Sequence, residues 1–320
     1  MLNIRGYQVL EQLYQGPHST IYRAIKQDDQ QQCVIIKVPS VTPPQSAQID
    51  KLRKEFEICR RIDSDYVVQC LELKPDDVYG FLLIEKDDQA DALINHIPKT
   101  GFEIIDFLKI AIQLAEGLGA IHRNRVIHKD IKPTNIIYHP GSGKIKYIDF
   151  NNASLLHQYR QNTSVLDRAT EGTLAYISPE CTGRINRMID YRTDFYSLGI
   201  TFYQLLCGKL PFEVKSVAEL LLCHLDRQPL APTDVKSEIP KPLSDIIMKL
   251  LQKDIEARYQ SAFGLLTDLK KCIEEFTQTG KITPFILAEQ DIPEFFYIPQ
   301  KLYGRESECL QLTQAFDRVT

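Results

Sequence analysis

The feature that most constrains the fold of this 320-residue chain is a pair of short polar motifs flanked by apolar residues. The first, VIHKDIKPTNIIY at residues 126–138, places a histidine, an aspartate, lysines and an asparagine between apolar ends. The second, KYIDFNN at residues 146–152, delivers Asp149 at the end of a short apolar run. Removing a carboxylate from water is costly unless a partner compensates it. Asp149 is therefore expected either to cap the next turn or to hold a cation.

The spacing of the two motifs favours the cation. Phosphoryl transfer needs a carboxylate that orients the attacking hydroxyl, a positive charge at the moving phosphate, and an asparagine and an aspartate that bind magnesium. The first motif contains the first three of these groups, and Asp149 follows about fourteen residues later. An ordinary polar turn would not need this density of functional groups. The two motifs together therefore predict phosphotransferase chemistry.

Composition and charge argue against several other classes of protein. With 43% hydrophobic and 25% charged residues, the chain is typical of a globular protein large enough for two lobes. The net charge of −4 argues against binding through bulk charge, so no nucleic-acid partner is expected. The eight cysteines form no CxxC pair, which favours reduced thiols in a cytoplasmic protein. No window approaches roughly 18 uninterrupted apolar residues, so no membrane span is expected.

Hydrophobic periodicity divides the chain into a strand-rich part and a helical part. Up to residue 85, short β-branched or aromatic runs alternate with turn-forming residues, and one helix, with Ser46 as its N-cap, is expected to interrupt them. From Ile104 onward the pattern is helical, and DFYSLGITFYQLLCG is apolar nearly all round, as in a helix at the centre of a lobe. We therefore expect a small, mostly β lobe, a connector near residues 85–92 and a larger α lobe ending near residue 278.

In their order and spacing, five motifs resemble those of the eukaryotic-type protein kinases, across roughly residues 7–276. HKDIKPTN stands where the family has HRDLKPxN, IDFN where it has DFG, VIIK where it has VAIK, ISPE where it has APE, and DFYSLG where it has DVWSLG. The resemblance implies the α+β bilobal kinase fold. Its small antiparallel β lobe with one helix would cover residues 1–85, and the hinge and α-helical lobe would cover residues 86–278.

The resemblance also implies the residues that carry the chemistry. Asp130 would be the catalytic base and Lys132 the cation at the γ-phosphate. Asn135 and Asp149 would bind Mg²⁺, so ATP and Mg²⁺ are the expected cofactors. Thr173 matches the threonine that contacts the catalytic aspartate in serine/threonine kinases, and KPTN after Asp130 points to the same class.

Lys37 in CVIIKV would hold the α and β phosphates of ATP, and it needs a partner that fixes its direction. Glu55 in the interrupting helix is the partner that the resemblance implies. Glu57 is the alternative, but two residues on a helix is more than half a turn, so only one can face Lys37. The other ATP-binding residues implied are Gly16 in the phosphate loop, Ile21, Ile35 and Ile137 around the base, Ile84 as the gatekeeper behind adenine, the backbones of Glu85 and Asp87 as hinge contacts, and Asp91 at the ribose.

Two structural contacts follow from the same resemblance. Glu180 in ISPE is expected to form a buried ion pair with Arg258, which would anchor the end of the activation segment. Asp194 is expected to accept backbone hydrogen bonds from the catalytic loop at His128 and Lys129.

The chain departs from the family pattern in three places. The phosphate loop keeps only Gly16 of GxGxxG, which predicts weaker nucleotide binding or another turn. Lys129 replaces an arginine and lacks its bidentate fork, so we expect activity without phosphorylation of the activation segment. Asn151 replaces a glycine at a position where positive φ is expected, which predicts a stiffer hinge and an intact metal site.

Three functions remain under consideration. An active serine/threonine protein kinase in bacterial signal transduction, with an unknown protein substrate, is favoured because all the catalytic groups are present. The alternatives are an ATP-binding pseudokinase that acts as a regulatory scaffold, and a small-molecule phosphotransferase, which the SPE segment and Arg258 disfavour.

Residues 279–320 differ in composition and hydrophobic periodicity from the lobes before them. They read as a linker and the start of a following P-loop ATPase-like region, similar to large cyanobacterial-type hybrids in which such a kinase precedes an ATPase, a sensor and a histidine kinase. No GxxxxGK[ST] motif occurs in the chain. Downstream domains of the same full-length chain are therefore expected partners.

Overall fold

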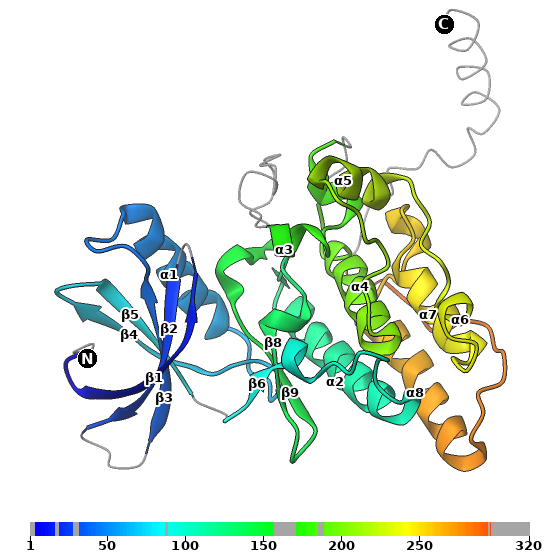
Figure 1. The fold of residues 1–320 in the computed structure, drawn as a ribbon, viewed down its shortest axis with the longest axis horizontal. Helices are drawn as coiled ribbons and strands as arrows, with labels where there is room; N and C mark the ends of the chain where they lie inside the picture. The colour runs from blue at the N-terminus through cyan, green and yellow to red at the C-terminus, as the bar shows by residue number, and fades with distance from the viewer. Residues whose placement is uncertain are drawn as a thin grey trace, which may run out of the picture.

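The computed structural model describes residues 4–16, 19–27, 32–86, 89–156, 171–184, 189–293 and 295. These residues form a small lobe built on a β-sheet and a larger helical lobe (Figure 1). The α+β bilobal architecture expected from the sequence is thus confirmed. Among the described ranges, no helix combines the length and the apolar character that crossing a membrane requires.

The small lobe is a five-stranded antiparallel sheet in the order β1-β2-β3-β5-β4. The strands are β1 (Tyr7–Gln15), β2 (Ser19–Lys26), β3 (Cys33–Pro39), β4 (Cys70–Asp76) and β5 (Gly80–Lys86). Side chains of β3 alternate between two faces. One face carries Ile36 into an apolar cluster with Ala24 and Ile84, and the opposite face carries Lys37 towards the interior of the site.

One helix, α1 (Ser46–Cys59), packs against this sheet. Gln45 is its N-cap residue, and the Gln48 side chain accepts a hydrogen bond from the Gln45 backbone at 3.1 Å, so the prediction of Ser46 as N-cap is wrong by one residue. The helix buries a stripe that includes Leu52 and Glu55. Glu55, the polar residue in that stripe, contacts Lys37 in the site described below.

The large lobe contains the remaining elements. Its helices are α2 (Ile104–Arg123), α3 (Glu171–Leu174), α4 (Thr193–Cys207), α5 (Val217–Leu225), α6 (Pro232–Val235), α7 (Lys241–Leu250) and α8 (Ala262–Thr279). Its short strands are β6 (Asp91–Ala92), β7 (Val126–Ile127), β8 (Ile136–His139), β9 (Lys144–Tyr147) and β10 (Ser154–Leu155), which form a β6-β8-β9 sheet and a β10-β7 pair. The 3₁₀ turns are η1 (Leu93–His96), η2 (Pro133–Asn135), η3 (Phe150–Asn152), η6 (Pro179–Thr182) and η7 (Ile255–Ala257).

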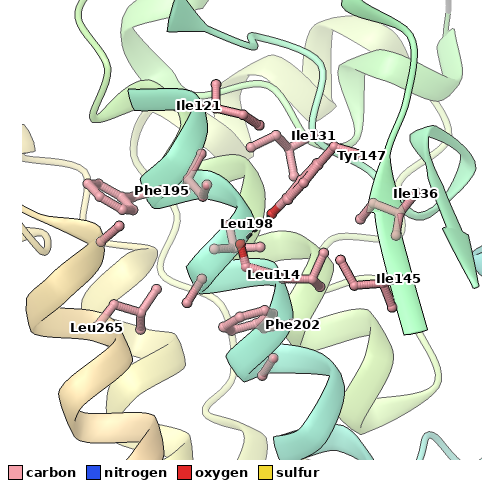
Figure 2. Close-up of a cluster of buried hydrophobic side chains, with 14 of the residues drawn as sticks. Leu114, Ile121, Ile131, Ile136, Ile145, Tyr147, Phe195, Leu198, Phe202 and Leu265 are labelled. Carbon is pink, nitrogen blue, oxygen red and sulfur yellow. Dashed lines mark hydrogen bonds between the residues drawn. The ribbon is translucent and has the colours of Figure 1, made fainter. Parts of the chain in front are cut away.

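Helix α4 lies at the centre of this lobe, and nearly all of its residues are buried, as its sequence predicts. Figure 2 shows Phe195, Leu198 and Phe202 of α4 among the core residues that include Leu114 of α2. The ring of Phe202 meets that of Phe107 edge to face at 5.5 Å between centroids. This core packs α2 against α4. The catalytic loop follows α2, and the activation segment ends shortly before α4.

The segment after α8 packs on the large lobe. The sequence alone does not show whether it does so. We call residues 281–293 the strap. Helix α8 ends before Gly280, whose φ of 70° turns the chain back along the helix. Near that end, the Thr283 hydroxyl donates to Glu275 at 2.7 Å, and one turn earlier Lys271 lies over the Phe285 ring at 4.2 Å.

The strap continues towards the N-terminal end of α8. The Ala288 backbone donates to Asp268 at 2.8 Å, and Asp291 accepts from the Gln260 backbone at 2.6 Å and from the Ser261 hydroxyl at 2.7 Å. Beyond it, the ring of Phe295 lies 5.2 Å from that of Tyr191. The predicted start of an ATPase-like region falls in 296–320, outside the described residues.

Asp291→Ala tests whether the strap belongs to the folded lobe. We expect the variant to lose about 1–3 kcal/mol of unfolding free energy, because two donors near the start of α8 lose their acceptor. Urea unfolding of the full chain measures this loss, with the exposed Glu289→Ala as the matched control. Equal stability of the two variants would mean that the strap only touches the lobe.

Candidate active site

A buried lysine joins three parts of the chain at the junction of the lobes. The ammonium nitrogen of Lys37, on β3, lies 2.9 Å from both carboxylate oxygens of Glu55, on α1. It also lies 2.8 Å from Oδ1 of Asp149, at the turn after β9. The Lys37 and Glu55 side chains are 4% and 1% exposed, whereas Glu57 is exposed on the outer side of α1. Glu55, not Glu57, is therefore the partner of Lys37.

The charged forms of Lys37 and Asp149 stabilise each other, whereas at Glu55 burial outweighs Lys37 and raises the pKa to about 8. Burial alone would lower the pKa of Lys37, but the neighbouring carboxylates of Asp149, Glu55 and Glu85 outweigh burial and raise it. Burial alone would raise the pKa of Asp149, but Lys37 outweighs burial and lowers it. Lys37 therefore stays protonated and Asp149 stays ionised at neutral pH. With 32% of its side chain exposed, Asp149 can also reach a ligand.

The backbone at Asp149 has the left-handed conformation, with φ 65° and ψ 71°. A non-glycine residue holds this conformation only where its surroundings enforce it, and here Lys37 binds the side chain while the next backbone N–H, of Phe150, donates to Glu55 at 3.1 Å. The prediction that Asn151 takes the positive φ is wrong, because Asn151 lies within the 3₁₀ turn η3 and lacks positive φ. Asparagine in place of glycine therefore adds no backbone strain.

The catalytic loop gathers polar groups around Asp130. The Lys132 ammonium lies 2.8 and 2.9 Å from the two Asp130 oxygens and donates to the Thr173 hydroxyl at 2.6 Å. The Asn135 amide donates to Asp130 Oδ2 and to its backbone oxygen, both at 2.9 Å. The structure thus brings together Asp130, Lys132, Asn135 and Thr173. The Asn152 amide also donates to Asp130 Oδ2, at 3.3 Å, a contact that the sequence reasoning missed.

Asp194, at the start of α4, accepts hydrogen bonds from the backbone of the catalytic loop. Its carboxylate accepts from the His128 backbone at 2.9 Å and from the Lys129 backbone at 2.8 Å, the two donors named for it from the sequence. His122 of α2 lies 3.0 Å from the same carboxylate. Lys129 has φ 65°, so these backbone hydrogen bonds also hold a strained residue in place.

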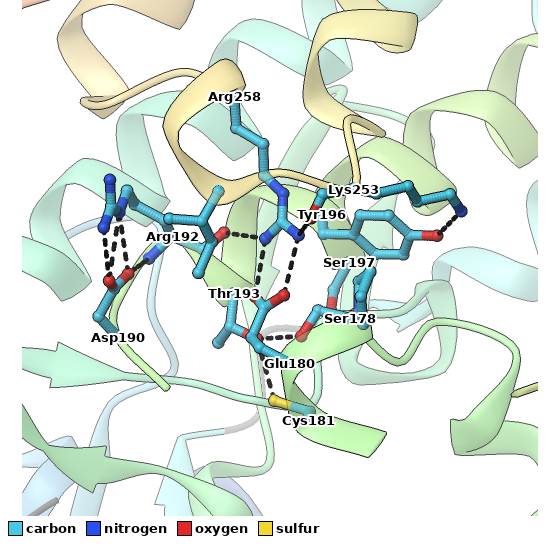
Figure 3. A network of polar contacts seen from close by, with 12 residues as sticks. Ser178, Glu180, Cys181, Asp190, Arg192, Thr193, Tyr196, Ser197, Lys253 and Arg258 are labelled. Atoms are coloured by element: carbon cyan, nitrogen blue, oxygen red, sulfur yellow. Dashed lines mark hydrogen bonds and ion pairs between the residues drawn. The ribbon is translucent and has the colours of Figure 1, made fainter. Parts of the chain in front are cut away.

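Glu180 and Arg258 form the second buried anchor (Figure 3). Two parallel hydrogen bonds of 2.7 and 2.8 Å join the guanidinium to the carboxylate, and Arg258 also donates to the backbone oxygen of Arg192 at 3.2 Å. Burial alone would raise the pKa of Glu180, but Arg258 outweighs burial and lowers it. The end of the activation segment is thereby fixed to the turn before α4.

The phosphate loop is tied down despite its missing glycines. The Gly16 backbone nitrogen donates to the Ser19 oxygen at 3.0 Å, and the Ser40 hydroxyl donates to the Gly16 oxygen at 2.5 Å. A Cβ at Gly16 would overlap the end of the exposed Tyr14 ring, which would have to turn away. The turn itself contains Pro17 and His18, which lie outside the described residues, so both expectations for this loop stay predictions.

This loop forms one wall of a cleft between the lobes. The cleft is lined by Tyr14, Gly16, Ser19, Pro39, Gln48, Lys51, Leu52, Asp130, Lys132, Asp149, Asn151, Asn152 and Thr173. It therefore joins the phosphate loop to the groups around Asp130 and to Asp149. Lysine ammonium groups, asparagine amides and two carboxylates therefore line one cleft, as binding of a phosphate chain with a cation requires.

The predicted gatekeeper Ile84 is on the wrong face of the sheet. Ile84 lies opposite Ile36 and packs in the apolar cluster of the small lobe. Leu83 lies opposite Lys37, and Glu85 lies opposite Ile35, so these two share the face of Lys37. The strand reaches Lys86, so Glu85 is inside β5 and not in the connector where the hinge contact was expected. The register with β3 decides the faces, and the sequence does not show it.

The remaining nucleotide-site predictions have mixed outcomes. Ile21 and Ile35 are partly buried on the face that carries Lys37, and Ile137 is partly buried on β8 of the other lobe. Asp87 lies outside the described residues. Asp91 accepts from the Ala92 backbone at 2.7 Å and from the Asn95 amide at 2.9 Å, and its strand β6 pairs with β8 beside Ile137.

The oxygen donors of the site fit a magnesium ion bound with a polyphosphate. Asn135 turns its amide nitrogen towards Asp130, which leaves the amide oxygen for a cation, and Asp149 uses one oxygen for Lys37. Among the described residues no cluster of three or more His, Cys, Asp or Glu could hold a metal by itself. Mg²⁺ commonly takes one or two protein carboxylates and completes its shell with phosphate and water.

Comparison with known proteins agrees with this geometry. Residues 7–268 match the family described as protein kinase domain. A probable serine/threonine-protein kinase of Clostridium perfringens is 28% identical over 269 residues, covering 83% of this chain and 38% of that protein. PrkC, a serine/threonine-protein kinase of Bacillus subtilis, is 27% identical over 227 residues, covering 71% of this chain and 34% of that protein.

A longer relative shows the same similarity. Hybrid signal transduction histidine kinase G of Dictyostelium discoideum is 29% identical over 314 residues, covering 71% of this chain and 9% of that protein. The chain thus spans well under half the length of these three relatives.

Glu180→Gln tests the second anchor and its pH dependence. At pH 7 we expect a loss of about 3–5 kcal/mol of unfolding free energy, because Arg258 stays buried without its charged partner. The folded pKa of Glu180 is lower than its unfolded value of 4.5, so its contribution is complete above about pH 4.5 and is lost as the pH falls through the folded pKa.

The difference between the wild type and Glu180→Gln should therefore shrink below about pH 4.5. Urea unfolding at pH 7 and in a series down to about pH 3 measures it. Glu256→Gln, which removes a partly exposed partner of Arg192, is the control and should cost under about 1 kcal/mol. A difference that stays constant over the whole series would contradict the ionised pair.

Proposed function

This chain belongs to the protein kinase family, and from that premise we propose that it transfers the γ-phosphate of ATP to serine or threonine hydroxyls of a protein substrate in bacterial signal transduction. The observation that carries the proposal is Lys132, whose ammonium contacts both the Asp130 carboxylate and the Thr173 hydroxyl. This contact puts a base, a phosphate-binding cation and a hydroxyl from the activation segment at one point of the cleft.

In the proposed reaction Asp130 orients the substrate hydroxyl and accepts its proton. Hydrogen bonds from Asn135 and Asn152 to Oδ2 fix the direction of the carboxylate. Lys132 lies beside it and would stabilise the charge that develops on the transferred phosphate. Thr173 would help to present a serine or threonine hydroxyl, since it lies in contact with Lys132 at the floor of the cleft.

Lys37 would hold the α and β phosphates of ATP, because Glu55 and Asp149 fix the direction of its ammonium beside Asp149, which lines the cleft. Asn135 and Asp149 would hold Mg²⁺, which would supply positive charge to the phosphates of ATP. Gly16 would cover the phosphates, and Ile21, Ile35 and Ile137 would enclose the base. Glu180, Asp194 and Arg258 act as structural residues that hold the catalytic loop and the activation segment.

The structure adds no support to the regulatory-scaffold alternative. Hydrogen bonds join Gly16 to Ser19 and Ser40, and Asn151 lies in η3 without a positive φ. A small-molecule phosphotransferase is disfavoured by the buried pair of Glu180 and Arg258, which orders a platform next to the cleft for a protein substrate.

We also infer that the chain works as one part of a longer signalling protein. Phe295, beyond the strap, lies against Tyr191, so the last described residue is beside the turn before α4. The seven cysteines of the described residues are unpaired, which fits a reducing, ATP-containing cytoplasm.

Phosphate transfer from labelled ATP and Mg²⁺ to the chain itself or to a general protein substrate tests the proposal. We expect the wild type to transfer phosphate and Asp130→Asn to be slower by about 10²–10⁴, because the amide cannot accept the proton. Asp63→Asn, at an exposed site in the small lobe, is the matched control and should keep full activity. A wild type that binds ATP and transfers no phosphate would establish the scaffold instead.

A further inference from the structure

Glu85 is a buried carboxyl group that the proposed phosphotransfer does not use. It is 8% exposed and lies on β5, opposite Ile35 of β3 on one side and Cys70 of β4 on the other. Residues that pair across a sheet point to the same face. Glu85 therefore shares the face of Lys37, which lies two residues from Ile35 along β3.

The polar contacts of Glu85 are weak for a buried acid. The Cys70 thiol lies 3.8 Å from Oε1, and a thiol is a poor hydrogen-bond donor. No ion pair to Glu85 forms within the part of the chain that the structure describes; Lys37 is occupied by Glu55 and Asp149. Burying a carboxyl group with so little compensation is costly. This indicates that a bound ligand supplies the missing hydrogen-bond donor.

The position of Glu85 indicates which part of a nucleotide it would meet. Under the proposed function, Ile21 and Ile35 would cover one side of the base and Lys37 would hold the phosphates, so a base packed on Ile35 would turn one edge towards the residue paired with Ile35 on β5. The side chain opposite Ile35 on that face is Glu85. An apolar side chain there could not distinguish bases by the hydrogen-bonding groups on that edge, whereas a carboxyl group can.

We propose that Glu85 is a specificity-determining residue of the nucleotide site, and that its carboxyl group accepts a hydrogen bond from the 6-amino group of adenine. The inference rests on the proposed function, because it needs ATP in the cleft. Burial raises the pKa of Glu85, with Asp149 adding to the effect and Lys37 opposing it. A neutral carboxyl group still offers its carbonyl oxygen as the acceptor.

Direct binding by calorimetry in the presence of Mg²⁺ tests this inference. The two ligands are ATP and purine riboside triphosphate, which carries hydrogen in place of the 6-amino group. The proteins are the wild type, Glu85→Gln, Glu85→Met and Glu85→Leu, with the exposed Glu72→Met on the neighbouring strand as the matched control. The quantity compared is the ratio of the two dissociation constants for each protein.

The wild type is expected to bind the analogue at least about tenfold more weakly than ATP, because a buried hydrogen bond is lost. That ratio should fall by about tenfold in Glu85→Met and Glu85→Leu. It should stay within about threefold of the wild type in Glu85→Gln, whose amide oxygen still accepts, and should not change in Glu72→Met.

A merely structural effect of Glu85 on Lys37 would weaken both ligands alike and leave the ratio unchanged, and this result would overturn the inference. Equal binding of the two ligands by the wild type would overturn it without any variant. A wild type that binds neither ligand would overturn the proposed function as well, whereas binding with an unchanged ratio overturns the role of Glu85 alone.

Discussion

The structure depends on the contact of one buried ammonium with two carboxylates. Lys37 joins the sheet to α1 through Glu55 and joins the small lobe to the large one through Asp149. Breaking a buried ion pair by removing one partner typically costs about 3–5 kcal/mol, so the three groups hold one another in place. The orientation of α1 and the closure of the lobes are set together by this contact.

The consequences of that contact run into the catalytic loop. The turn that presents Asp149 places the Phe150 N–H on Glu55 and packs the Phe150 ring against that of His128, at 4.7 Å between centroids. The His128 backbone is held in turn by Asp194, whose α4 helix occupies the centre of the large lobe. One chain of contacts therefore leads from the helix of the small lobe to the floor of the cleft, and it contains the proposed base, Asp130, within the same loop.

A second chain of contacts leads away from the cleft. Arg258 binds Glu180 and the backbone oxygen of Arg192, Arg192 donates to the Gln260 side chain at 2.6 Å, and the Gln260 backbone donates to Asp291 of the strap. The end of the activation segment and the strap thus share one buried polar network. Because such groups are costly when unpaired, each helps to keep the others ordered.

The sequence predicts the parts of the site that short motifs specify, and fails where register or distant contacts decide. HKDIKPTN and IDFN carry their functional groups at fixed spacing, so the grouping around Asp130 and Asp149 could be expected. The prediction of Ile84 as gatekeeper is wrong because a shift of one residue in the pairing with β3 reverses the face to which a side chain points. The left-handed residue is Asp149 because Lys37 fixes its side chain, and the strap packs through polar pairs that have no periodic signature.

We propose that contacts among the described residues assemble the catalytic centre without phosphorylation of the activation segment, as Lys129 in place of arginine predicts. The initial rate of phosphate transfer by full chain that has been exhaustively treated with a phosphatase, and then freed of it, tests this claim most directly. The account predicts transfer at the untreated rate from the first time point. A lag that ends only as the chain becomes phosphorylated, or complete inactivity after the treatment, would contradict it.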